Sequence, residues 1–183
     1  MSLPAEEKVT CSKCGHQQPF SVWNTLDVVQ NPELKARFLA GQLNSYVCAE
    51  CGDEQYVLYP MLYYDAGRKL VIWLAGEEPA DDLPVPAELE EDPAEDYRFR
   101  WVTSENQLRE KVLIEDAGLD DRMVEIFKVL IRQSAEDSGE DIEGELFFTG
   151  TSEDEDGPRM DFVIVSDQEV VPTCVPLESY SAF

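Results

Sequence analysis

The sequence has no long apolar run, and its first residues do not have the basic and then apolar pattern of a signal peptide. Its longest uninterrupted apolar stretch, residues 70–75, has the length of a β-strand, whereas a membrane-spanning helix needs about 20 apolar residues. The first residues also lack the charged and then apolar pattern of a secretory signal peptide. These absences argue against a membrane-spanning or secreted protein, and we expect a cytoplasmic one.

The sequence also has few of the residues and motifs that common catalytic sites use. His16 is the only histidine, so a Ser-His-Asp triad would have to use it, and the chain contains no glycine-rich phosphate loop. Adjacent acids such as Asp120-Asp121 and Glu115-Asp116 are expected by chance in a chain with 39 Asp and Glu residues. The sequence therefore assigns no catalytic residue. It favours a protein that is not an enzyme and leaves that question open.

Positive charge is the third scarcity, with 14 Lys and Arg against 39 Asp and Glu and a net charge of −25. Residues 1–75 hold 8 acids and 6 bases, whereas residues 76–183 hold 31 acids and 8 bases, so the two parts carry −2 and −23. Nucleic-acid binding depends on Lys and Arg that neutralise phosphates. We therefore expect no nucleic-acid partner, and the charge is of the kind that attracts a basic protein partner.

Cysteine, by contrast, occurs in a specific pattern. Four of the five cysteines form two C-x-x-C-G motifs, residues 11–15 and 48–52, with 33 residues between Cys14 and Cys48. Two such pairs can close a tetrahedral site around one metal ion, and the glycine after each pair suits a turn with positive φ. The fifth, Cys174, makes the count odd, which argues against a disulfide framework.

We predict that one zinc ion is bound by Cys11, Cys14, Cys48 and Cys51. A tetrahedral four-sulfur site suits zinc or iron, so a rubredoxin-like iron centre is the alternative. Four thiolates leave no open position for water or substrate, and the metal is therefore expected to stabilise the fold rather than to catalyse a reaction. Because all four thiols are present, His16 is expected to be an exposed turn residue and not a ligand.

Residues 1–75 are predicted to form a zinc-ribbon-like domain with an inserted helix and hairpin. Asn31 and Pro32 are a typical helix start. Strand-like stretches follow at residues 56–59, 61–64 and 69–74, and a turn at residues 65–67 makes a hairpin.

Residues 76–96 separate the two halves of the chain. These 21 residues contain ten acids, four prolines and no Lys or Arg. Such a segment buries little apolar surface and does not sustain a regular strand ladder. We therefore predict an acidic, proline-rich linker and place the domain boundary in it.

Residues 97–183 are predicted to form an acidic α+β part with two helices and a β-hairpin, after a first strand at residues 97–102. Ser104 and Gln107 form a capping box that starts the first helix. A second helix is predicted to start near Asp120, since apolar residues recur there at helical spacing. The fold class of the whole chain is thus predicted to be α+β.

The end of the chain gives weaker patterns. Residues 146–148 and 162–165 are predicted as the paired strands of the hairpin. The tail, which contains Pro172 and Pro176, is predicted to be irregular. Cys174 has no histidine or basic cluster beside it in the sequence, so we expect a small buried residue and not a nucleophile.

The two cysteine motifs, the helix start and a proline-containing turn together resemble the CpXC domain family, which is named for its paired C-P-x-C motifs. Ser12 and Ala49 stand where that family has proline, but proline supplies no ligand. The resemblance implies a cysteine-bound metal and a bacterial or archaeal setting, and it implies no particular activity. The matching stretches are the two cysteine motifs and residues 31–35, 41–44, 59–65, 110–114 and 117–121.

We therefore predict a zinc-stabilised module that binds or regulates a partner protein. Two alternatives come from other classes: rubredoxin-like electron transfer, and a hydrolase whose site the sequence does not reveal. The best candidate for an exposed recognition edge is Tyr63-Tyr64-Asp65. The identity of the partner, the biological process and the oligomeric state are not specified by the sequence.

Overall fold

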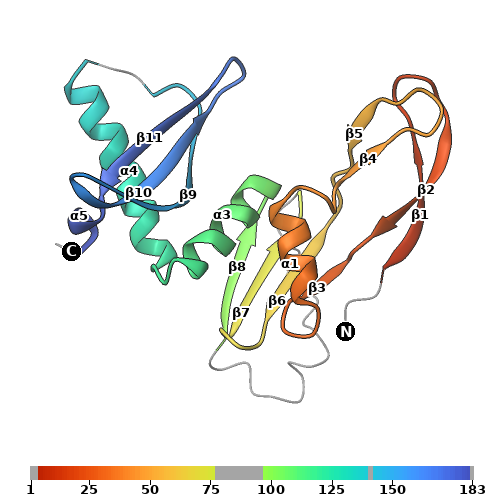
Figure 1. The fold of residues 1–183 in the computed structure, drawn as a ribbon, viewed down its shortest axis with the longest axis horizontal. Coiled ribbons are helices and arrows are strands. Elements are labelled where there is room, and N and C mark those ends of the chain that lie inside the picture. Colours follow the sequence, from red (N-terminus) through yellow and green to blue (C-terminus); the bar gives the residue numbers. More distant parts are fainter. Residues whose placement is uncertain (1–3, 77–96, 140–141, 182–183) are drawn as a thin grey trace. The chain divides into compact units, whose positions relative to one another are not determined.

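A computed structural model describes residues 4–76, 97–139 and 142–181 (Figure 1). The chain divides into two compact units, Met1–Leu108 and Arg109–Phe183. Within the described ranges, no helix is long and apolar enough to cross a membrane.

The first unit contains two β-hairpins that carry the cysteine motifs. Strands β1 (Ala5–Thr10) and β2 (Gln17–Val22) pair antiparallel, and strands β4 (Ser45–Val47) and β5 (Glu54–Tyr56) form a second antiparallel pair. Each pair is joined by one C-x-x-C-G motif, so both motifs occupy hairpin turns (Figure 1). No residue of β1, β4 or β5 is buried.

The same unit contains a four-stranded sheet in the order β3-β6-β7-β8. Strands β6 (Met61–Asp65) and β7 (Leu70–Leu74) form the predicted hairpin, and β3 (Thr25–Asp27) and β8 (Arg98–Val102) pair parallel to them on either side. Helix α1 (Pro32–Leu39) starts at the predicted proline.

Two expectations for this sheet need correction. Tyr63, Tyr64 and Asp65 are buried, because β6 is a central strand whose five residues are all covered, so they form no recognition edge. Strand β8, which was assigned to the second half, completes the sheet of the first unit. Strand β7 is apolar on both faces and is largely buried, so its backbone N–H and C=O groups need hydrogen-bonded strands along both edges. Strand β6 lies along one edge and β8 along the other.

Along the chain, the division between the two compact units falls between Leu108 and Arg109, within helix α3 (Glu105–Asp116). The predicted linker, residues 76–96, lies outside the described residues except for Gly76. The start of α3 follows the predicted capping pattern, because the N–H of Gln107 donates to Oγ of Ser104 at 3.2 Å.

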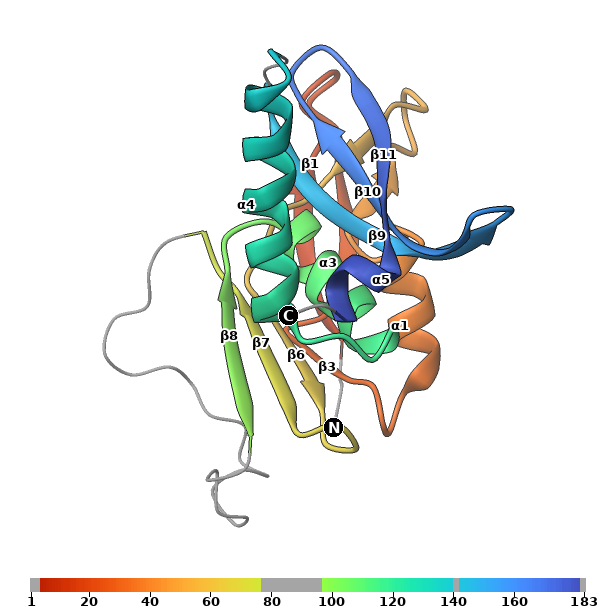
Figure 2. The same cartoon turned by 90° about the vertical axis from the view of Figure 1, so that its left-hand side faces the viewer.

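The second unit packs helix α4 (Asp121–Asp137) against a three-stranded antiparallel sheet (Figure 2). The sheet has the order β11-β10-β9, with strands β9 (Glu145–Asp154), β10 (Gly157–Val165) and β11 (Val170–Pro176). The short helix α5 (Leu177–Ser181) follows. The core consists of Ile114, Val124, Phe127, Leu146, Phe148, Met160 and Phe162.

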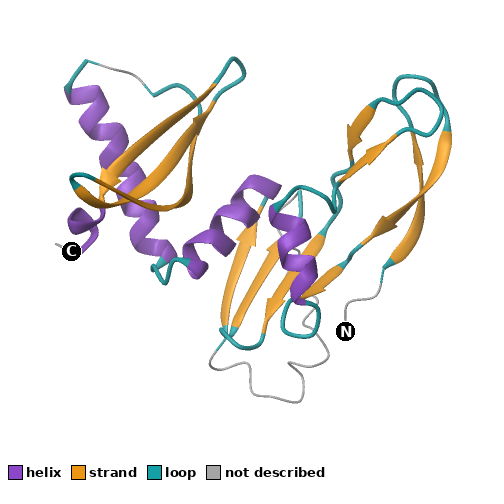
Figure 3. Ribbon diagram, viewed as in Figure 1, coloured by secondary structure: helices purple, strands orange, loops and turns teal. Residues whose placement is uncertain are grey.

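The predicted helices and hairpin of this unit are present, but the tail is not irregular. Pro172 and Pro176 lie in β11, an edge strand, where a missing N–H on the outer side costs no ladder bond. Cys174 also lies on β11 and is exposed, so the expectation of a buried residue was wrong. Figure 3 shows helices and strands in both units, which confirms the α+β class.

A charged group lies inside the second unit. The Glu110 side chain is 1% exposed, and its carboxylate accepts hydrogen bonds from the N–H of Phe148 at 2.7 Å and from Nζ of Lys128 at 3.0 Å. Lys128 also pairs with Glu125 at 3.1 Å. These contacts tie α3 to α4 and to β9, so we expect the carboxylate to be a structural requirement of this unit.

Candidate metal centre

The two cysteine motifs fold into the same backbone turn. In the first, the N–H of Cys11 donates to the carbonyl of His16 at 2.8 Å and the N–H of Gly15 donates to the carbonyl of Cys11 at 2.9 Å. In the second, the N–H of Cys48 donates to the carbonyl of Asp53 at 2.8 Å, and the N–H of Gly52 donates to the carbonyl of Cys48 at 2.9 Å. Both glycines have positive φ, 75° and 70°, as their position after the pair predicts.

These turns bring the four predicted ligands together. The sulfur atoms of Cys11, Cys14, Cys48 and Cys51 all lie within 4.8 Å of one another. Each motif contacts the other, since Cys11 Sγ lies 3.7 Å from Cys51 Sγ and Cys14 Sγ lies 3.6 Å from Cys48 Sγ. A tetrahedral ion with metal–sulfur bonds of about 2.3 Å needs sulfur–sulfur distances of about 3.8 Å. The donor set therefore fits a single tetrahedral ion.

The first cysteine of each pair is covered and the second faces solvent. Cys11 and Cys48 are 2% and 1% exposed, whereas Cys14 and Cys51 are exposed. A metal ion at this position would thus lie near the surface, at the tip of the two hairpins. Such a position suits a folding cross-link.

The thiols influence one another's ionisation. Hydrogen bonds from the backbone N–H of Cys51 and then of Glu50, acting against burial, lower the pKa of Cys48 to about 6. At Cys14 the backbone bond from His16 acts in the same direction, but burial and hydrogen bonds with the other three cysteines raise its pKa to about 12. The four thiols therefore do not all ionise readily without a cation, and metal binding would release protons.

His16 is not part of the sulfur cluster, which contains only the four cysteines. Its backbone carbonyl accepts a hydrogen bond in the first turn, which agrees with the expected turn role, but the residue is half-buried and not exposed. Lys13 bridges the motifs by an ion pair with Asp53, Nζ to Oδ1 at 2.7 Å. The hydrogen bond and charge of this exposed pair raise the pKa of Lys13 and lower that of Asp53, but exposed pairs contribute little to stability.

Two glutamines that the sequence analysis did not single out contact the motifs. Oε1 of Gln18 accepts the N–H of Ala49, and Oε1 of Gln55 accepts the N–H of Ser12, at 2.8 and 3.0 Å. Each glutamine lies seven residues after the first cysteine of its own motif. Aligning the two motifs with each other and extending the alignment past the glycines would have found them.

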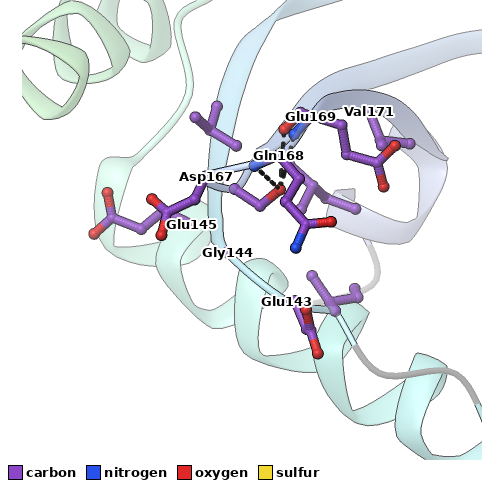
Figure 4. A pocket seen from close by; sticks show the side chains of 11 residues that line it. Glu143, Gly144, Glu145, Asp167, Gln168, Glu169 and Val171 are labelled. Atoms are coloured by element: carbon purple, nitrogen blue, oxygen red, sulfur yellow. Dashed lines mark hydrogen bonds between the residues drawn. The ribbon is translucent and has the colours of Figure 1, made fainter.

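A separate pocket of about 790 Å³ lies in the second unit (Figure 4). Among the residues that the structure describes, its lining includes Glu143, Glu145, Asp167 and Glu169 but no histidine, lysine or cysteine. Gly144 is required there, because a Cβ at its φ of 112° would lie 2.3 Å from the carbonyl oxygen of Val165. The lining contains no pairing of a nucleophile with a base, so it assigns no catalytic residue.

Comparison with known proteins identifies a family for this chain. A family model described as CpXC protein matches residues 9–128, which is more than half of the chain and includes all four clustered cysteines. No curated protein and no solved structure matches. With the match over this length and the cysteine cluster in place, the chain belongs to the CpXC family.

Proposed function

We propose that the four cysteines hold one structural zinc ion and that the protein is a non-enzymatic module for binding a protein partner in the cytoplasm, where thiols stay reduced. The observation that carries the metal part is the sulfur cluster, whose spacing fits a tetrahedral ion. Iron accepts the same ligands. We favour zinc because closed four-cysteine sites on paired turns are typical structural zinc sites.

The hairpins themselves support a structural role for the metal. Strands β1, β4 and β5 bury none of their residues, and the buried side chains of β2 are Phe20 and Val22. Two short hairpins with so little apolar contact are not stable by hydrophobic burial alone. The ion, when bound, supplies a cross-link between their turns. Cys11 and Cys48 bind from the covered side, and Cys14 and Cys51 bind from the solvent side.

We expect purified protein to contain one zinc ion per chain and to be colourless. Four thiolates saturate the ion, and zinc has no visible transitions in such a site. Elemental analysis and an absorption spectrum of the same sample test this. Stoichiometric iron with strong visible absorption would contradict the zinc assignment and favour electron transfer.

A surface on the second unit supports the interaction role. A groove of about 590 Å³ runs between α4 and β11, and among its lining residues Leu130 and Val171 are 41% and 37% exposed. It shares Ile142, Ile164 and Val171 with the acidic pocket of Figure 4. Strand β11 is an edge strand, and the lining residues that the structure describes include no Lys or Arg. The partner we propose is therefore an extended segment with alternating apolar and basic residues.

A labelled peptide of alternating valine and lysine should therefore bind the full chain, with an affinity that falls as salt rises. Fluorescence anisotropy would measure the binding. We expect the double change Glu143→Gln and Glu169→Gln, and separately Val171→Ser, to weaken it about tenfold. The matched control is Glu153→Gln with Glu155→Gln, two exposed acids outside both linings. If the two double changes weaken binding equally and Val171→Ser binds like the wild type, the peptide responds to net charge alone, and this surface is contradicted.

A further inference from the structure

Gln18 and Gln55 occupy equivalent places in the two hairpins. Each is the second residue of the returning strand, β2 or β5. In the strand registers each lies opposite the residue two positions before the first cysteine, Val9 for Gln18 and Tyr46 for Gln55. Both glutamines are half-buried, while the residues directly before and after them are exposed. The two glutamines therefore occupy equivalent positions in the two hairpins, just as the two cysteine motifs do.

Their hydrogen bonds cross from one motif to the other. Gln18 belongs to the first hairpin and receives the N–H of Ala49 in the second motif at 2.8 Å, and its Nε2 donates to the carbonyl of Val47 at 3.2 Å. Gln55 belongs to the second hairpin and receives the N–H of Ser12 in the first motif at 3.0 Å, and its Nε2 donates to Oγ of Ser12 at 2.7 Å. Each motif is thus held by the glutamine of the other.

We propose that this glutamine clamp, Gln18 and Gln55, is a positioning device that keeps the two cysteine motifs together and slows the loss of the metal. The inference rests on the proposed metal site. Each clamp bond fixes the peptide directly after a buried ligand, Cys11 or Cys48. The two clamp bonds can form because Ser12 and Ala49 each have a backbone N–H, which a proline at these positions would lack.

The clamp acts on release because a metal ion leaves one thiolate at a time. When a first sulfur detaches, the two motifs must separate before the ion escapes, and the clamp bonds oppose that separation. A detached thiolate that stays near the ion rebinds, as in any preorganised site. Gln55 is itself held in place, because its Nε2 donates to Oδ2 of Asp53 and its Oε1 accepts the hydroxyl of Tyr46, each at 3.1 Å.

The test compares zinc-loaded full-length wild type with Gln18→Met and Gln55→Met, which keep the side-chain length and remove the hydrogen bonds. Zinc transfer to an excess of a chromogenic chelator gives the rate of loss. Each change should raise that rate at least about tenfold, since outer-shell partners typically contribute 10–100-fold to metal affinity. The matched control is Gln17→Met, in the residue next to Gln18. Gln17 is exposed, and among the hydrogen bonds described its side-chain amide contacts only Thr10. Gln18→Asn, which keeps the amide on a shorter side chain, serves if the methionine variant does not fold.

A second measurement detects the crossing itself. Solvent exchange of backbone amides, followed by NMR, should speed up at Ala49 in Gln18→Met and at Ser12 in Gln55→Met, in each case in the opposite motif. Unchanged zinc loss and unchanged exchange in both variants would overturn the clamp and leave the metal site intact, provided that the wild type retains its zinc. Wild-type protein that binds no metal would overturn the proposed function itself, and the clamp's role in retention with it.

Discussion

Replacing Cys48 with serine should abolish stoichiometric metal binding and lower the melting temperature of the first unit by roughly 10 °C or more. Cys48 is 1% exposed, and its sulfur contacts that of Cys14 across the two motifs. Serine removes one of four thiolates, and the hairpins have little buried apolar surface with which to compensate. Zinc content and thermal unfolding of the full chain measure the two effects.

Cys174→Ser is the matched control, because it changes a cysteine on exposed strand β11, outside the sulfur cluster. It should keep one zinc ion and melt close to the wild type, since exposed substitutions usually change stability little. Equal melting temperatures for Cys48→Ser and wild type would count against a structural metal site.

The second large effect is expected at Glu110, in the other unit. Glu110→Ala should reduce the free energy of unfolding by about 3 kcal/mol or more, because it removes one partner of a buried ion pair. The N–H of Phe148 would lose its acceptor and Lys128 would keep only Glu125 among the carboxylates described around it. Denaturant unfolding measures this, with the exposed Glu136→Ala as control. A loss no larger than that of the control would show that the buried carboxylate is dispensable.

The neutral variant Glu110→Gln separates charge from hydrogen bonding and volume. Burial raises the pKa of Glu110 above its ordinary value, although Lys128 and the N–H of Phe148 act against this. The folded protein therefore holds the proton more readily, so this group stabilises the fold below its ordinary pKa and loses that contribution as pH rises through its folded pKa. Glutamine does not titrate, so wild type should lose stability relative to Glu110→Gln as the pH rises above the ordinary glutamate pKa of about 4.3. The opposite trend would show that the pair with Lys128 outweighs burial.

The features that the sequence predicted depend on residues close together in the chain. Each C-x-x-C-G motif determines its own turn, including the positive φ of Gly15 and Gly52. Pro32 fixes the start of α1, and Ser104 caps α3. The meeting of the two motifs was predictable because a tetrahedral ion demands four ligands and the chain offers two pairs.

The features that were missed depend on pairing between distant segments. The place of β8 beside β7 follows from the bonding needs of an apolar central strand, which no local pattern reveals. Tyr63 and Tyr64 look like aromatic surface residues until β6 is known to be covered on both faces. Strand β11 was obscured by its prolines, which an edge strand tolerates. The glutamine clamp was missed because its signal is a glutamine repeated seven residues after the first cysteine of each motif.

X-ray absorption at the zinc edge of the purified full-length protein tests the central claim most directly. The account predicts one zinc ion per chain with four sulfur neighbours at about 2.3 Å and no nitrogen or oxygen in the first shell. Protein without zinc, or zinc with nitrogen or oxygen among its four ligands, would contradict a site formed by Cys11, Cys14, Cys48 and Cys51.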